Sequence, residues 1–99
     1  MGFVVAEKQG PHGLLLVITD QDLLGKYFSD QKAQLDLTKP FYKGTENSKE
    51  EVKQKIHTAR HLHLTGKESV ALGIELDLVE ARGILWVQGV PHAEVVMGE

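Results

Sequence analysis

With 99 residues the chain is long enough for one hydrophobic core and too short for two, so we expect a single domain over residues 1–99. The lack of cysteine excludes disulfides and thiolate zinc sites, and it favours a reducing cytoplasm over secretion. The 14 acidic and 11 basic side chains give a formal net charge of −3, so any contact with a polyanion has to be local.

A β-hairpin is predicted at the start of the chain. Residues 3–7 and 14–18 are apolar and rich in β-branched side chains, and the segment 9–13 between them has the composition of a turn. The second strand is a run of five consecutive apolar residues, Leu14 to Ile18. Such a run indicates burial on both faces and a central place in the sheet.

Two weaker elements are predicted in residues 19–38. Thr19 and Asp22 have the spacing of a helix start, and apolar residues then recur at helical spacing as far as Phe28. We therefore predict a short helix here, weakened by Gly25. Residues 34–38 alternate apolar and polar side chains, which is typical of a half-exposed strand.

Two longer helices are predicted, each behind a capping box. Ser48 to Glu51 starts the first, which should reach about Arg60, and Thr65 to Glu68 starts the second, which should reach Leu78. The remaining strands are predicted at residues 61–64, 84–87 and 93–97, and the turn Gly89-Val90-Pro91 divides the last two.

The predicted order of elements, ββαβαβαββ, corresponds to an α+β fold. It consists of one mixed β-sheet with β-hairpins at both ends, two to three helices and one βαβ crossover. We place this right-handed crossover at the strand around Leu62, the helix from Lys67 and the strand around Ile84.

Four short motifs resemble a known family in their order and spacing. They are Asp22-Leu23-Leu24-Gly25-Lys26, Phe41-Tyr42-Lys43-Gly44, Leu64-Thr65-Gly66 and Gly89-Val90-Pro91-His92-Ala93. Over nearly the whole chain the sequence resembles a family of small archaeal proteins, the domain of unknown function 424, and the last motif is the most distinctive. The resemblance implies an archaeal cytoplasmic protein of about this length, and it implies no activity. His61 and His63 depart from the family pattern, so no role is transferred to them.

The junction Thr65-Gly66-Lys67 is a candidate anion site. A strand passes there through a glycine into a helix start, where free N–H groups and the helix dipole favour an anion, and Lys67 would add a full charge. The junction is not a nucleotide-binding P-loop, because His61 and Glu68 stand where that motif requires Gly and Ser or Thr. The alternative is an ordinary capped helix in which Glu68 already occupies the free amides.

The segment Lys39-Pro40-Phe41-Tyr42-Lys43-Gly44 places two aromatic rings between two lysines. Exposed rings beside cations are typical of surfaces that bind single-stranded nucleic acid, and the same composition suits a protein hot spot. The alternative is that the rings fold inward and cover the edge of the core.

Histidines provide the remaining candidates. His92 follows Pro91 in a predicted turn, where it could act as an acid, a base or a phosphate donor, or could lock the turn by donating to a backbone carbonyl. His57 and His61 stand one helical turn apart near His63, which suits a divalent metal, but no carboxylate or cysteine completes this set. We predict no metal and no cofactor, and surface histidines instead.

The leading hypothesis is a small binding module whose partner is RNA or a ribonucleoprotein. No serine, cysteine or acid at diagnostic spacing marks a nucleophile or triad, so an enzyme is less favoured. The alternatives left open are a small enzyme acting on a phosphorylated substrate through His92 and a protein–protein adaptor. The sequence has no signal-peptide pattern and no apolar run that could cross a membrane, so we expect a cytoplasmic protein with no membrane partner and leave its oligomeric state open. The candidate binding residues are Lys39, Phe41, Tyr42, Lys43, Thr65, Gly66, Lys67 and His92.

Overall fold

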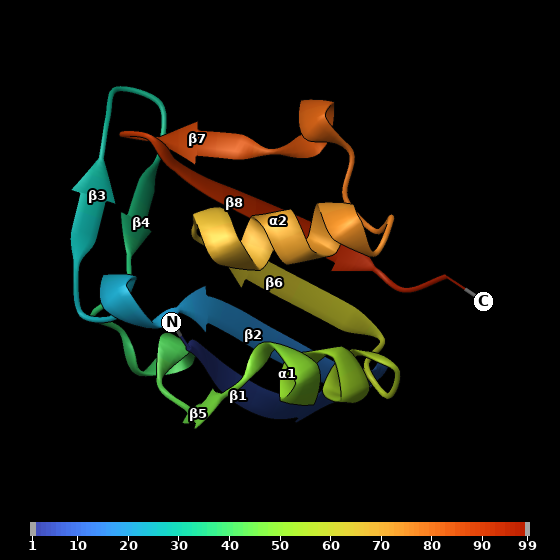
Figure 1. The fold of residues 1–99 in the computed structure, drawn as a ribbon. Helices are drawn as coiled ribbons and strands as arrows, with labels where there is room; N and C mark the ends of the chain where they lie inside the picture. The colour runs from blue at the N-terminus through green and yellow to red at the C-terminus, as the bar shows by residue number, and fades with distance from the viewer. Residues whose placement is uncertain (1, 99) are drawn as a thin grey trace.

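A six-stranded mixed β-sheet carries two α-helices on one face in the computed structural model, which describes residues 2–98 (Figure 1). Across this sheet the strands are β5 (Thr45–Asn47), β1 (Phe3–Gly10), β2 (Gly13–Asp20), β6 (His61–Thr65), β8 (Val90–Val96) and β7 (Leu85–Val87). The helices are α1 (Lys49–Ile56) and α2 (Lys67–Glu75). A separate two-stranded sheet consists of β3 (Tyr27–Ser29) and β4 (Gln34–Asp36). The predicted α+β class, with one mixed sheet and a hairpin at each end, is confirmed.

The N-terminal hairpin forms as predicted. β1 and β2 pair antiparallel from Phe3 opposite Asp20 to Gly10 opposite Gly13. Side chains 16–18 of β2 are fully buried, because the helices cover one face of this strand and other segments cover the second face. The apolar run in the sequence therefore marks the central strand correctly.

The predicted crossover is present, because β6 and β7 both run antiparallel to β8 and are therefore parallel to each other, with α2 between them in the chain. The sequence did not predict a second parallel connection, in which β2 and β6 pair directly and are joined by the long segment that contains α1. The chain leaves α2 for the outer edge of the sheet, forms the short strand β7 there, and returns as β8 into the inner place beside β6. The longer β8 fills the inner position because it contributes side chains to both hydrophobic cores, Ala93 to one and Val90 to the other.

The short helix predicted in residues 19–28 is largely absent. Thr19 and Asp20 complete β2, only Gln21–Leu23 form a single 3-10 turn, and Tyr27 already lies in β3. Gly25 has a φ of 88°, which ends any helical path, and the Asp20 carboxylate bonds to α2 instead of its own following turn.

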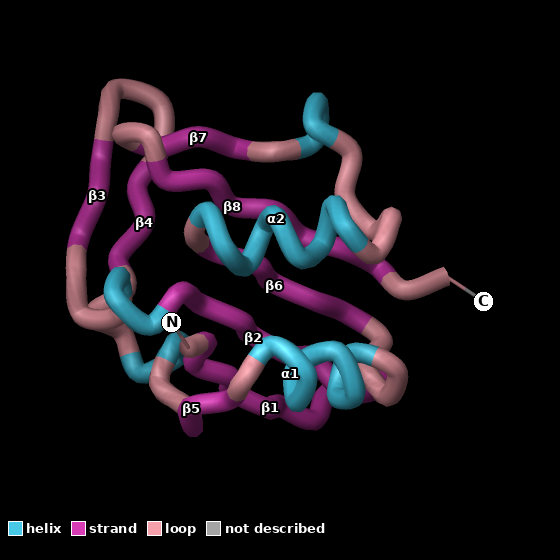
Figure 2. The backbone as a smooth tube through the Cα atoms, in the orientation of Figure 1, coloured by secondary structure: helices cyan, strands magenta, loops and turns pink. Residues whose placement is uncertain are grey.

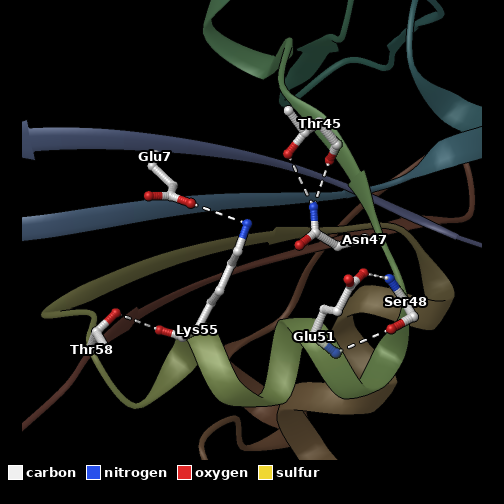
Figure 3. Close-up of polar contacts among 7 residues, drawn as sticks. All are labelled: Glu7, Thr45, Asn47, Ser48, Glu51, Lys55 and Thr58. Atoms are coloured by element: carbon white, nitrogen blue, oxygen red, sulfur yellow. Dashed lines mark hydrogen bonds and ion pairs between the residues drawn. The ribbon is translucent and has the colours of Figure 1, made fainter.

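The capping box at the start of α1 is confirmed. The Glu51 backbone N–H donates to Ser48 Oγ over 3.2 Å, and the Ser48 N–H donates to Glu51 Oε1 over 2.7 Å (Figure 3). Lys55 of α1 reaches Glu7 of β1 over 3.1 Å and ties the helix to the sheet (Figure 3). The helix ends at Ile56, before the predicted Arg60, because residues 57–59 continue as tight turns.

Helix α2 ends at Glu75, before the predicted Leu78, because the chain turns away at Asp77. Asp77 has a left-handed φ of 62°, and the Leu78 N–H donates to the Gly73 carbonyl, as in a Schellman motif. The helix therefore stops at Glu75. Over residues 2–98 neither helix, with 8 and 9 residues, has the length and apolar character needed to cross a bilayer.

Two hydrophobic cores lie on opposite faces of the sheet. The larger core lies under α1 and α2 and contains Leu62, Leu64 and Ala93. The smaller core contains Leu35 and Leu37 of the β4 segment with Val87 and Val90 of the β7–β8 hairpin. Figure 2 shows the β3–β4 pair at the end of the sheet where α2 begins, so only part of the second face is covered.

Replacing Ser48 by Ala should lower the free energy of unfolding by about 1 kcal/mol, because the Glu51 N–H loses its acceptor at the helix start. Urea unfolding followed by circular dichroism measures the change. Gln54→Ala, at an exposed position of the same helix, is the control and should change the stability by less than about 0.5 kcal/mol. Equal stability of the Ser48 variant and the parent would contradict the capping box.

Candidate functional site

The sheet face opposite α1 and α2 carries polar side chains at its centre, and we call it the site face. Because side chains alternate along a strand, and Leu62 and Leu64 of β6 face the helices, their neighbours point the other way. The site face is formed by His61, His63 and Thr65 of β6 and by His92 and Glu94 of β8. Strand register places His63 directly opposite Glu94, and Thr65 directly opposite His92.

Hydrogen bonds connect these side chains in a row. Thr65 Oγ1 lies 2.9 Å from His92 Nδ1, and His92 Nε2 lies 3.3 Å from Glu94 Oε2. The same Glu94 oxygen lies 4.0 Å from His63 Nδ1, so the carboxylate stands between two imidazoles. Solvent exposure of the side chains increases along the row: Thr65 is fully buried, the His92 side chain is 10% exposed and the Glu94 side chain is 64% exposed.

The order hydroxyl, imidazole, carboxylate is that of a hydrolase triad. The attacking group of a triad has to meet the substrate, and here the Thr65 hydroxyl has no solvent exposure. This geometry therefore gives His92 the role of a buried hydrogen-bonding partner more readily than that of a general base.

Aromatic rings extend the row toward the edge of the covered region. Phe41 of the 3-10 turn η2 (Pro40–Tyr42) meets the His63 ring edge-on at a centroid distance of 5.6 Å. The Lys8 ammonium lies 5.0 Å from the centroid of the Phe41 ring, and the His63 and His92 rings stand 5.8 Å apart. One ring and one cation thus stand beside the polar row on the site face.

Burial changes the acidity of two of these groups. It lowers the pKa of His63, and the nearby His92 and His61 add to this effect while Glu94 opposes it. Burial also raises the pKa of Tyr42, as do the charges of Asp36 and Glu94. Both shifts favour the neutral form of the side chain.

The segment 39–43 is divided between core and surface. Tyr42 packs against the smaller core, and Phe41 is half-buried between Lys8 and His63. Lys39 and Lys43 are exposed. The two rings therefore have different surroundings, and only Phe41 lies on the site face.

The junction Thr65-Gly66-Lys67 is capped by a residue that the sequence analysis did not select. Asp20 Oδ2 accepts from the Glu68 N–H over 2.9 Å, and Oδ1 accepts from the Ser69 N–H over 2.8 Å and from Ser69 Oγ over 2.7 Å. The predicted capping box is wrong, because the N-cap residue is Gly66 and has no side chain to donate or accept. Gly66 has a φ of 108°, and a Cβ atom there would overlap the Asp20 carboxylate.

An external anion at this helix start would have to displace Asp20. The cleft beside it has a volume of about 440 Å³, and three carboxylates, those of Asp20, Asp22 and Glu68, line it together with the exposed Lys67. Like charges in the cleft oppose anion binding, so Lys67 acts against an unfavourable local field.

His92 lies inside strand β8 and not in a turn. The hairpin turn is Gln88-Gly89, whose φ angles of 51° and 79° are both positive, as a two-residue hairpin loop requires. Pro91, which suggested a turn, is a buried strand residue opposite Trp86, and its carbonyl accepts from the Gly66 N–H.

Three residues of these sites were missed by the sequence analysis. Glu94 and Lys8 belong to the site face through strand alternation alone, which could have placed Glu94 beside His92. Asp20 caps a helix 48 residues away, and no local pattern indicates such a contact. His57 is the C-cap that follows α1 and His61 belongs to β6, so the predicted one-turn spacing of these two histidines does not exist.

Comparisons with known proteins identify the family and the fold. Residues 7–97 match the model of a family described as "Protein of unknown function (DUF424)". A solved structure, described as "Crystal structure of an uncharacterized conserved protein from Methanopyrus kandleri", is similar with a TM-score of 0.78 and 19% identity over 100% of this chain and 96% of the other. At this identity the likeness shows a common fold. The comparison with curated proteins found no significant match.

Replacing Asp20 by Ala should lower the free energy of unfolding by about 2–3 kcal/mol. Two backbone N–H groups and one hydroxyl at the start of α2 lose their acceptor, and Asp20 itself is buried, with 6% of its surface exposed. Chemical unfolding measures the loss. The neighbouring exposed Asp22→Ala is the control, and an equal effect of both variants would contradict the cap.

Replacing His92 by Ala should cost about 1–3 kcal/mol, because the buried Thr65 hydroxyl loses its partner. Thermal unfolding of this variant beside His12→Ala, which removes an exposed histidine in a turn, measures the difference. A change below about 0.5 kcal/mol would instead place His92 among residues that serve only contact with a partner.

Proposed function

Since the chain belongs to the DUF424 family, whose description names no activity, we propose a function from the chemistry of the site face: a small binding module that holds RNA, free or in a ribonucleoprotein. Binding would use Phe41 as a stacking surface, with Lys8, Lys39 and Lys43 as phosphate contacts. We place this activity in the cytoplasm, in keeping with the lack of cysteine.

The observation that carries this proposal is the position of Phe41. The half-buried ring stands on the site face with a lysine ammonium 5.0 Å from its centroid and the edge of His63 beside it. A base that stacks on such a ring contributes about 1–3 kcal/mol whatever its identity, and the adjacent cation would meet the phosphate of the same nucleotide.

The distribution of charge supports a local contact despite the net charge of −3. On the helix side, Lys49 and Lys53 pair with Glu75 over 2.9 and 3.2 Å. Within residues 2–98, Lys8, Lys39 and Lys43 have no carboxylate within ion-pair distance. Their charges therefore remain available to an external anion.

A protein–protein adaptor is the second candidate, and the edge strand β7 favours it. Leu85 and Trp86 on this strand are 45% and 54% exposed. A short edge strand with exposed apolar side chains can accept a strand or an aromatic anchor from a partner. An enzyme acting through His92 has less support, because the neighbouring Thr65 hydroxyl is buried.

Replacing Lys39 and Lys43 by Ala should weaken binding to single-stranded RNA and flatten its salt dependence. Each phosphate contact contributes about 0.7 to the slope of log affinity against log salt, so two lost contacts should reduce the slope by about 1.4. Fluorescence anisotropy with labelled RNA at several salt concentrations measures both effects. Phe41→Ala should weaken binding by roughly tenfold or more at any salt.

The controls remove equal charge and an equal ring from other places. Lys49 and Lys53 replaced together by Ala test the helix side, and Tyr27→Ala removes another exposed ring. Equal losses in test and control variants, or no binding of the parent protein to RNA from its own cells at low salt, would overturn the proposal and leave the adaptor.

A further inference from the structure

We propose that His63, His92 and Glu94 bind a divalent transition-metal ion, with Zn²⁺ the best match to the ligand set. Each side chain offers one ligand atom, and these atoms all lie within 4.8 Å of one another. The sequence pattern suggested a different set, His57, His61 and His63, and the two sets share only His63. It does not depend on RNA binding.

The sheet fixes the three ligands relative to one another. His63 and Glu94 are direct partners in the antiparallel β6–β8 pair, and His92 precedes Glu94 by two residues on the same face. Strand β6 pairs with β2 and β8, and β8 pairs with β7 as far as His92, so His63 and His92 have strand partners on both sides, whereas Glu94 has one on the β6 side alone. Two imidazoles and one carboxylate with a free fourth position form the ligand set of zinc sites that keep a water or a substrate.

The distances are close to those of a metal site. Two ligands that each bind Zn²⁺ at about 2.0–2.1 Å in tetrahedral geometry stand about 3.3 Å apart. His92 Nε2 and Glu94 Oε2 are 3.3 Å apart, and His63 Nδ1 is 4.0 Å from the same oxygen. The Glu94 side chain is 64% exposed, so it has room to make the remaining adjustment.

Thr65 orients one of the imidazoles. Its hydroxyl lies 2.9 Å from His92 Nδ1, and a hydrogen bond from that nitrogen to Thr65 leaves the lone pair of Nε2 directed toward Glu94. A metal-bound histidine commonly has such a partner on its second nitrogen, which fixes the ring and its tautomer. In this tautomer a cation between the Nε2 lone pair and the carboxylate would take the place of the hydrogen bond that Nε2 otherwise donates to Glu94.

Charge and access also suit a cation. Within residues 2–98, the only basic side chains within 4.0 Å of the Glu94 carboxylate are the two imidazoles, since no lysine or arginine pairs with it. A depression of about 140 Å³ beside His63 and Glu94 opens the site to solvent, and His61 lines its wall. The fourth coordination position is therefore accessible to water or to an external ligand.

Calorimetric titration of the untagged protein with Zn²⁺ in a non-coordinating buffer tests the site, and Co²⁺ absorption reports its coordination. We expect one ion per chain. His63→Ala and Glu94→Gln should each weaken binding by tenfold or more, and Thr65→Val, which leaves all three ligands in place, by about tenfold. His57→Ala and Glu50→Gln are matched controls at exposed positions and should bind as the parent does.

The test avoids His92, whose removal is expected to destabilise the fold. Thermal unfolding without metal confirms that each variant is folded, and a Tm increase with Zn²⁺ in the parent but not in His63→Ala gives a second readout. Absence of saturable binding at micromolar Zn²⁺, or an equal loss in His57→Ala, would overturn the proposal. Loss of metal binding in a variant that still binds RNA would leave the proposed function untouched.

Discussion

The Asp20 carboxylate joins the N-terminal hairpin to helix α2. It stands at the end of the central strand β2 and accepts from two N–H groups and one hydroxyl at the start of α2. An acid at this position stabilises the helix through both hydrogen bonds and the helix dipole. Gly66 has to be glycine so that the carboxylate can approach, and Thr65 immediately before it is thereby fixed opposite His92. The same contact that orders the helix face thus also orders the polar row on the site face.

That polar row is unusual for the centre of a sheet. Thr19, Thr65 and His92 are buried on adjacent strands, where apolar side chains would give a simpler core. Thr19 Oγ1 has no hydrogen-bond partner within residues 2–98. Buried polar groups cost stability unless their hydrogen bonds are satisfied, and departures from the simplest packing concentrate at functional places. The unpaired hydroxyl of Thr19 lies at the buried end of the row, directly opposite Thr65.

Sequence reasoning succeeded where the signal is local. The turn after β1, the apolar run of β2 and the Ser48 capping box each lie within a few residues, and each formed as predicted. It failed where a distant contact competes with the local pattern, because Asp20 of β2 caps α2 in place of the predicted Thr65 capping box. Of the site face, the sequence identified Phe41, Thr65 and His92 as candidates. It missed Glu94 because only strand register brings that carboxylate between two imidazoles.

The two proposals for the site face are physically coupled, although neither requires the other. Glu94 is the carboxylate in direct contact with the row of imidazoles, and Phe41 touches His63 at the other side of that row. A dication bound by Glu94 would change the local charge there from negative to positive. Charges closer together than the Debye length are only partly screened by salt, so this change would be felt beside Phe41. Phosphate groups beside Phe41 would then meet a more favourable field. Because such coupling is reciprocal, RNA bound on the site face would raise the affinity for the metal by the same factor as the metal raises the affinity for RNA.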